Sequence, residues 1–435
     1  MTARPEPSAK SAAQRPPSGG AGAGFDVGHV LLLVVATLAM QAVAWFVLFR
    51  IPAITGWHWG LWSTDGDLRV YYRYAAKMAQ GLLPFRDFPI EYPPLFVPLI
   101  WIDRLAPNAD AFVAAFERLM VGFSAVTALL VAFAAEDGVD KRRPYAAAAM
   151  FSLGVVAIGG LAVNRYDMVV AAILALFLLC MVRGWWEVAG IVLGVGFALK
   201  ITPAVLLPLL LFVAPWRRGR WALAGFAVVA VVPFAVAAAS GPHGIENLRY
   251  MLDYHLVRPL EVGSVAGTPI WFAHLPPAPP VQILHTAASR ALGGAPARLA
   301  ASLTGPATAA GLLFAYGMLW WRRDALRGDR RTIALAATAL LLVALAFAKV
   351  LSPQYFVWMA PPMALVFLER RTLGLLLLLT TAITQVVFPI TGDALLASSP
   401  HAVYVLAARN GLIVVCMVLA FVHLARLPRS APARA

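Results

Sequence analysis

Two aspartates, Asp65 and Asp67, are the residues of this sequence best suited to acid–base chemistry. They open a polar stretch, residues 63–95, which crowds carboxylates, cations and tyrosines between very apolar segments. An aspartate held beside a hydroxyl can act as a general base, a role that contributes about 10²–10⁴-fold in rate. A structural role is the alternative, because Thr64 and Asp67 have the spacing of a helix N-terminal cap. One aspartate can serve both purposes, so both interpretations stay open.

A third carboxylate, Glu91, stands directly before Tyr92, Pro93 and Pro94. A residue that precedes proline is restricted to extended geometry, so the chain makes a rigid corner here. Glu91 could therefore be held against a substrate. A solvated glutamate in an interfacial turn is the simpler interpretation.

Isolated cations stand where three later apolar segments end, at Arg165, Lys200 and Lys349. Each alone is most simply a structural residue whose charge snorkels to a membrane interface. If the three converge on one face, they could form a cationic pocket for a phosphate, since Lys and Arg are the usual partners of anions. Asp167 follows Arg165 closely and would share that pocket.

His255 and Arg258 are a further pair of potential anion ligands. Three residues apart, they would share one face of a helix and could bind the same anion, although a solvated loop helix is the alternative. The sequence contains no phosphate-cradling loop, serine nucleophile elbow or dinucleotide fingerprint. We therefore expect no metal and no cofactor. The other histidines, among them His58, His243, His274 and His285, do not have the spacing of metal ligands.

The elements that must position these residues are membrane helices. Of the 435 residues, 61% are hydrophobic and only 13% are charged, and the mean hydropathy is +0.77. A soluble domain carries about 25% charged residues. We therefore predict an all-α polytopic membrane protein with about 12 transmembrane helices. The predicted spans are residues 29–50, 113–135, 145–162, 168–183, 186–199, 201–215, 221–240, 303–321, 332–348, 353–368, 372–388 and 402–425.

The formal net charge is +14, and the cations occur in short runs between apolar segments. Such runs fit the positive-inside bias of cytoplasmic loops better than a nucleic-acid-binding stripe. Cys180 and Cys416 lie within apolar segments, so we expect neither a disulfide framework nor a zinc site. With the N-terminus in the cytoplasm, the cationic runs all fall on the cytoplasmic side: residues 141–143, 183, 217–220, 322–331 and 370–371.

The same threading places two long loops on the extracytoplasmic side, residues 51–112 and 241–302, with the isolated ionisable residues. It requires residues 93–107 to lie in the membrane interface, which their shortness and the prolines at 93, 94 and 98 favour. Residues 67–80 predict an interfacial helix, because apolar side chains fall on one face and cations on another.

Both chain ends are predicted to be tails on a single transmembrane domain. Residues 1–28, rich in Pro, Ala, Gly and Ser, predict a disordered cytoplasmic tail. Residues 29–425 would form the domain, beginning with an uncleaved first span, and residues 426–435 a second cytoplasmic tail.

Several motifs together resemble one known family. DLRVYY at 67–72 and EYPP at 91–94 are similar to the first outer loop of glycosyltransferase family 87. NRYD at 164–167, KITP at 200–203 and KVLSPQY at 349–355 resemble the later signatures of that family, in the same order. Its members are bacterial mannosyltransferases that use polyprenol-phosphate mannose and have the GT-C fold.

The resemblance implies an inverting transfer of mannose, or of another hexosyl or pentosyl group, from a polyprenyl-phosphate donor to a glycolipid or envelope glycan hydroxyl. It implies a multi-pass protein of the bacterial plasma membrane with an extracytoplasmic active site. Asp67 would be the general base, with Asp65 as its competitor. The implied donor-phosphate ligands are Arg165, Lys200, His255, Arg258 and Lys349. The implied substrate-binding residues are Tyr71, Glu91, Tyr92, Asp167, Gln354 and Tyr355.

A multi-pass transporter or flippase for lipid or sugar is the main alternative to an enzyme, and a membrane scaffold is a third possibility. Transporters place ionisable sites near the bilayer midplane, often between inverted repeats. Here the polar motifs gather at one membrane surface beside two long loops. This arrangement favours an enzyme.

Overall fold

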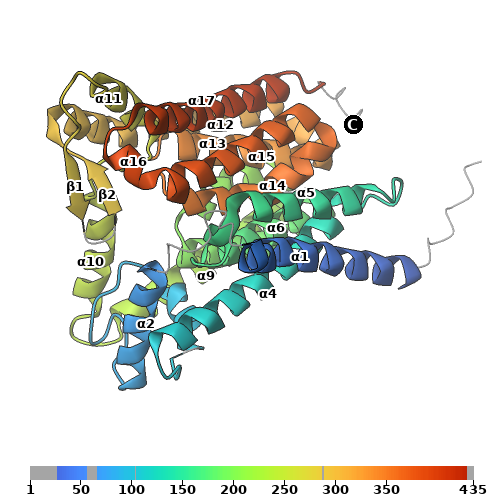
Figure 1. Cartoon of the computed structure of the whole chain (residues 1–435). Coiled ribbons are helices and arrows are strands. Elements are labelled where there is room, and N and C mark those ends of the chain that lie inside the picture. The colour runs from blue at the N-terminus through green and yellow to red at the C-terminus, as the bar shows by residue number, and fades with distance from the viewer. Residues whose placement is uncertain (1–26, 56–65, 103, 287–288, 429–435) are drawn as a thin grey trace, which may run out of the picture.

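The computed structural model describes residues 27–55, 66–102, 104–286 and 289–428, so Asp65 and Thr64 lie outside the described residues. Within them the chain is almost entirely helical, and the long helices lie roughly side by side (Figure 1). The predicted all-α membrane architecture is therefore confirmed.

Seven of the described helices are long and apolar enough to cross a membrane. The prediction for one of them was wrong at its start, because α12 begins at Gly294 and not at 303. Residues 294–302 include Arg298 and lack a continuous apolar run, which concealed this first part of the helix. The seven helices are α1 (Val27–Thr55), α4 (Ala109–Ala135), α5 (Arg143–Ile158), which a 3₁₀ turn continues to Ala162, α9 (Trp216–Ala238), α12 (Gly294–Gly328), α15 (Arg371–Gln385), which a π-helical turn continues to Ile390, and α17 (Pro400–Ala425).

Five shorter helices occupy the other positions at which the sequence predicts spans. Three of these helices, α6, α7 and α14, begin or end directly at the polar motifs, which interrupt the apolar segments before they reach full spanning length. The five are α6 (Asp167–Arg183), α7 (Trp186–Leu199), α8 (Leu207–Val213), which continues a 3₁₀ turn at Thr202–Leu206, α13 (Ile333–Ala346) and α14 (Phe356–Glu369).

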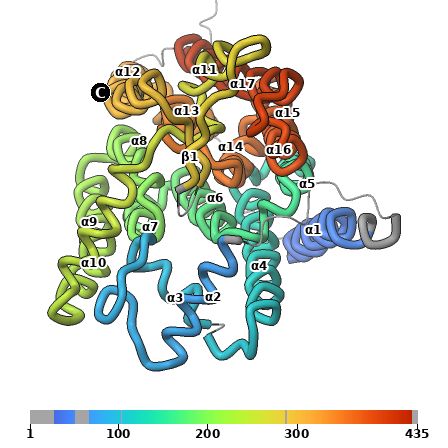
Figure 2. The backbone as a smooth tube through the Cα atoms, turned by 60° about the vertical axis from the view of Figure 1, so that its left-hand side comes forward, coloured from blue at the N-terminus to red at the C-terminus, as the bar shows by residue number. Residues whose placement is uncertain are grey.

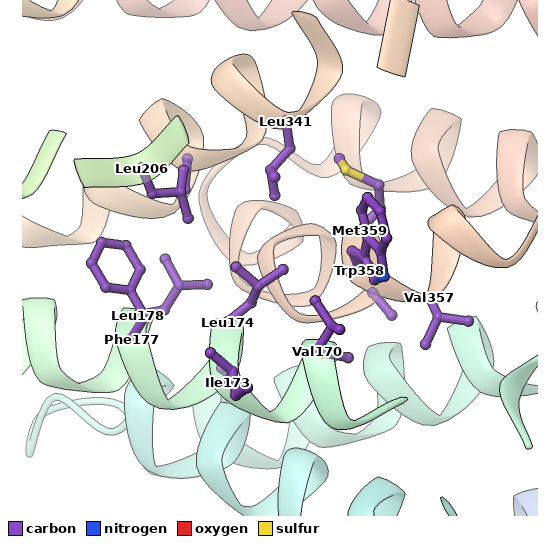
Figure 3. Packing of buried hydrophobic residues seen from close by; sticks show 14 of the residues in the cluster. Val170, Ile173, Leu174, Phe177, Leu178, Leu206, Leu341, Val357, Trp358 and Met359 are labelled. Carbon is purple, nitrogen blue, oxygen red and sulfur yellow. The ribbon is translucent and has the colours of Figure 1, made fainter. Parts of the chain in front are cut away.

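The core of the bundle lies around these shorter helices. Figure 3 shows Ile173, Leu174 and Phe177 of α6 packed beside Leu341 of α13 and Trp358 of α14. Almost every residue of α6 and α13 is buried. Because these helices are surrounded by protein on all sides, their apolar residues need no amphipathic pattern.

The two long loops are called the first and second outer loops after the side on which the sequence predicts them, and the first contains the predicted interfacial helix as α2 (Gly66–Ala79). Leu68 and Ala75 are fully buried, whereas Arg69 and Lys77 are exposed, so the expected two-faced pattern is confirmed. Gly81 follows in a left-handed conformation (φ 88°), which favours glycine and ends the helix. After it come a 3₁₀ turn, Pro94–Phe96, and the five-residue α3 (Val97–Trp101), which are too short to cross a membrane.

The second outer loop holds helices, as expected for the segment that contains His255, and a hairpin that the sequence did not predict. Its helices are α10 (Gly244–Leu256) and α11 (Thr268–Ala273). Strands β1 (Ile283–Thr286) and β2 (Ser289–Leu292) pair antiparallel, with Ile283 opposite Leu292. A last short helix, α16 (Gly392–Leu396), precedes α17.

The two long outer loops meet each other. Asn247 Nδ2 of α10 donates to the Phe85 carbonyl at 2.7 Å, and His255 Nε2 contacts the Glu91 carbonyl at 3.0 Å. Figure 2 shows the segment that carries α2 and α3 beside α10, below the body of the bundle. The outer loops therefore form one layer over the ends of the helices.

The turns that carry cationic runs also meet one another. Arg331 Nη2 lies 2.7 Å from Asp137 Oδ2, and Arg143 Nε lies 3.2 Å from the same oxygen. Arg143 also forms an ion pair with Glu369. These contacts join the ends of α4, α5, α12 and α14, so the cationic turns gather on one side, as the threading requires.

Candidate active site

Residues from six separate segments surround one cavity of about 290 Å³ at the outer-loop end of the bundle. α2, the corner at 91–93 and the C-terminal part of α10 contribute, as do the motifs at 164–167, 200–203 and 349–355. The predicted site residues that line it are Asp67, Tyr71, Glu91, Tyr92, Asp167, Lys200, His255, Arg258, Gln354 and Tyr355.

Asp67 enters the cavity from the first turn of α2, with its side chain 32% exposed. It forms an ion pair with Arg165, whose guanidinium is almost buried. Arg165 Nη1 also donates to the Asn164 carbonyl at 2.8 Å. Arg165 thus does not line the cavity. It orients the Asp67 carboxylate through the ion pair between them.

Asp167 and Lys200 form a buried ion pair at the inner wall of the cavity. Lys200 Nζ lies 2.7 Å from Asp167 Oδ1, which also accepts a hydrogen bond from Trp358 Nε1 at 2.6 Å. The ammonium is enclosed by the rings of Tyr166, Tyr355 and Trp358, at 4.6 to 4.9 Å from their centroids. Its charge is therefore already balanced by Asp167 and the ring faces.

His255 bridges α10 and the Glu91 corner. Its Nε2 must donate to the Glu91 carbonyl, because a carbonyl oxygen only accepts. Burial lowers the pKa of His255 below its usual value although the hydrogen bond to Glu91 opposes this, and the charges of Arg258 and Lys200 add to the lowering. The ring is therefore neutral at neutral pH, and its single N–H, on Nε2, donates to the Glu91 carbonyl. In that state it offers a phosphate no further donor.

Glu91 is also fixed through its side chain, because the Tyr74 hydroxyl donates to its carboxylate. Burial raises the pKa of Tyr74, and the neighbouring Glu91 carboxylate contributes to the rise. Tyr74 therefore stays protonated and can keep donating to Glu91. Glu91 is buried and held with its carboxylate at the cavity wall, so the solvated turn that the sequence favoured does not describe it.

Arg258 and Lys349 lie close together at the C-terminal end of α10. Arg258 lines the cavity beside the Tyr254 ring, and no carboxylate in the described part of the chain is ion-paired with it. Lys349 does not line the cavity, and its Nζ donates to the Leu256 carbonyl at 2.7 Å. Desolvation and the charge of Arg258 lower the pKa of Lys349. Arg258 is therefore the lining cation that is most available to an anion.

Buried tyrosines supply the neutral part of the cavity wall. Burial raises the pKa of Tyr71, Tyr92 and Tyr355, so all three carry their hydroxyl protons at physiological pH. Tyr71 and Tyr92 meet edge to face with ring centroids 5.4 Å apart. Protonated hydroxyls beside carboxylates suit the recognition of a polyhydroxylated ligand.

An apolar groove of about 520 Å³ adjoins the polar cavity. Ile201, Thr202 and Tyr355 belong to the walls of both. The rest of the groove is formed by residues of α12, α13, the 3₁₀ turn at Thr202–Leu206 and the segment 348–358, among them Leu312 and Leu345. A ligand with a polar head and an apolar chain could occupy the two spaces together.

The profile of glycosyltransferase family 87 matches residues 90–353, which is more than half of the chain. The chain belongs to glycosyltransferase family 87. It is a membrane glycosyltransferase. The matched segment contains every cationic candidate but begins after Asp67.

Among solved structures, this family 87 chain is similar to ArnT from Cupriavidus metallidurans in the apo state. The two share 16% sequence identity with a TM-score of 0.45, over 91% of this chain and 77% of that chain. No protein with curated annotation matches the chain.

Six residues that line the family 87 cavity were not among the predicted site residues: Pro93, Tyr166, Ile201, Thr202, Tyr254 and Ser352. Tyr166 and Ser352 lie inside motifs that had been singled out, and Tyr254 precedes His255, so proximity could have identified them. Trp358 had no such signal, because it reads as one more apolar residue of a buried helix.

Proposed function

We propose that this glycosyltransferase transfers a mannosyl group from a polyprenyl-phosphate carrier to a hydroxyl of a glycolipid or envelope glycan, with inversion. The proposal is supported above all by one observation. The Asp67 carboxylate and the Arg258 guanidinium share one cavity, which opens beside an apolar groove. A base, an anion-binding cation and space for a lipid chain are the parts that this reaction requires.

The proposed cavity faces the extracytoplasmic side of the bacterial plasma membrane. The cationic turns lie at the other end of the bundle, and such turns are usually cytoplasmic. Nucleotide sugars are not available outside the cytoplasm, so an activated sugar must arrive on a lipid. Its phosphate is a competent leaving group once cations neutralise the developing charge.

In the proposed reaction, Asp67 takes the proton of the acceptor hydroxyl while the hydroxyl oxygen attacks the anomeric carbon. The bond between that carbon and the phosphate oxygen breaks on the opposite face, and its electron pair stays with the phosphate. Arg258, supported by Lys349, stabilises this charge. Tyr71, Gln354 and protonated Tyr355 would contact the sugar hydroxyls.

The remaining residues have supporting roles in this proposal. Arg165 orients the base, and the Asp167–Lys200 pair fixes the wall between the polar cavity and the apolar groove. The polyprenyl chain would lie in that groove, against Leu312 and Leu345.

Replacing Asp67 tests the assignment of the base. We expect Asp67→Asn to lower the rate of transfer from polyprenyl-phosphate mannose by at least about 10²-fold, because a general base typically contributes that much. The rate is measured on purified protein by the release of polyprenyl phosphate. Asp65→Asn, in the same assay, decides between the two aspartates.

Asp110→Asn is the matched control, because Asp110 is an exposed carboxylate paired with Arg69 and outside the cavity. It should transfer at the wild-type rate. Near-normal transfer by folded Asp67→Asn protein would refute the role of Asp67 as the base.

A further inference from the structure

A buried arginine lies inside a membrane helix behind the cavity. Arg409 belongs to α17 and is 1% exposed. Ionisable residues within membrane spans are costly and commonly mark functional sites. Arg409 lies beyond the matched segment of the family, and the sequence motifs assign it no role.

Arg409 reaches out of α17 to the second outer loop. Its Nη2 donates to the Gly263 carbonyl at 2.7 Å, and its guanidinium lies 5.7 Å from the centroid of the Phe356 ring. A Cβ at position 263 would lie 3.2 Å from both Arg409 Nη2 and the Leu351 carbonyl oxygen, so the loop passes close to both groups. The arginine is thus tightly enclosed between the loop and the start of α14.

Glu261 places a buried carboxylate in the same region. It is 8% exposed, and its Oε1 accepts from Ser352 Oγ at 3.4 Å. Its backbone N–H donates to the Lys349 carbonyl at 3.0 Å. Burial raises the pKa of Glu261, and the positive charges of Arg258 and Arg409 oppose that rise. Glu261 therefore lies between the cavity wall, through Ser352, and the loop residue that Arg409 holds, and the charges of both arginines favour its ionised form.

We propose that Arg409 is a positioning residue, whose charge offsets that of Glu261 and so leaves Arg258 available for the donor phosphate. This inference rests on the proposed function. Charges interact strongly in a buried environment, where water does not screen them. Without Arg409, the Glu261 carboxylate would draw the Arg258 guanidinium toward itself and cancel its field in the cavity.

This role makes a prediction that a purely structural role does not. Arg409→Met should weaken phosphate binding, whereas adding Glu261→Gln should restore it, because the unbalanced carboxylate is then gone. If Arg409 served only to hold the Gly263 carbonyl, removing the Glu261 charge would not compensate. Arg409→Lys keeps the charge and should retain most of the affinity.

The test measures binding of polyprenyl phosphate to purified protein in nanodiscs, together with the KM for the lipid-linked donor. We expect Arg409→Met to raise the Kd for polyprenyl phosphate and the KM for the donor by at least about tenfold, with a smaller effect on kcat. In the double variant, both constants should return to within about threefold of their wild-type values. Arg322→Met is the matched control, because Arg322 is also buried and donates to backbone carbonyls, but near Leu427. It should leave both values unchanged.

Unchanged binding in Arg409→Met, or a double variant that folds but stays as weak as the single one, would overturn the positioning role alone. A wild-type protein that binds no polyprenyl phosphate would overturn the proposed function and this inference together.

Discussion

At the scale of single residues, the cations at the cavity are of two kinds. Some already have a carboxylate partner, and one is available to bind an anion. Arg165 is paired with Asp67, and Lys200 with Asp167. Arg258 lines the same cavity without such a pair among the described residues. A phosphate entering the cavity would therefore interact first with Arg258. We expect the lysines and arginines of the motifs to contribute unequally to donor binding.

His255 provides a test through pH. Its pKa is lowered by burial, so the ring is neutral above about pH 6.5 and gains its charge only in more acidic solution. The donor KM should therefore be constant between about pH 7 and pH 8 and fall at lower pH, where a protonated ring can also donate from Nδ1. Steady-state kinetics of transfer measure this profile.

His255→Gln is the comparison for that profile, since it keeps a donor for Glu91 but cannot gain a charge. The acid-side fall in KM should disappear in this variant. A KM change centred above pH 7 that His255→Gln abolishes would show that the histidine is charged at neutral pH, against this account.

At the scale of elements, short buried helices bring the polar motifs together. α6 begins at Asp167, α7 ends just before Lys200 and α14 begins just after Tyr355. α7 is held closely against α9, because a Cβ at Gly190 would lie 2.0 Å from the Ala222 carbonyl oxygen. Since each motif is attached to a packed helix end, the cavity wall is positioned by the core.

Labelling of helix ends tests the orientation of these elements. Single cysteines at His243, before α10, and Lys141, before α5, would both be exposed, whereas native Cys180 and Cys416 are buried. We expect a membrane-impermeant thiol reagent to label His243→Cys but not Lys141→Cys in intact cells. Labelling of Lys141→Cys alone would place the cavity in the cytoplasm and contradict the proposed donor.

At the scale of the whole molecule, much of the arrangement follows from composition and charge. Apolar segments predict the helices, cationic runs group the turns on one side, and the proline corner after Glu91 keeps the next segment from crossing. These signals are local, because each depends on hydrophobicity or backbone restriction within a few residues.

What could not be predicted depends on contacts between distant segments. The cage of rings around Lys200 joins three motifs, and the neutral state of His255 follows from its burial against Glu91. The early start of α12 and the hairpin beside Leu260 are stabilised by neighbours far away in the chain. Arg409 carried a signal, a charge within an apolar span, but its partners could not be inferred without the fold.

The central claim is that the cavity moves a sugar from a lipid phosphate to a hydroxyl. The most direct measurement incubates purified protein with polyprenyl-phosphate mannose and a glycolipid extract, and follows both products by mass and by anomeric configuration. We predict that polyprenyl phosphate is released in step with an acceptor that has gained one hexose of inverted configuration. Transfer that needs a nucleotide sugar, or an acceptor product that retains the donor configuration, would contradict the account.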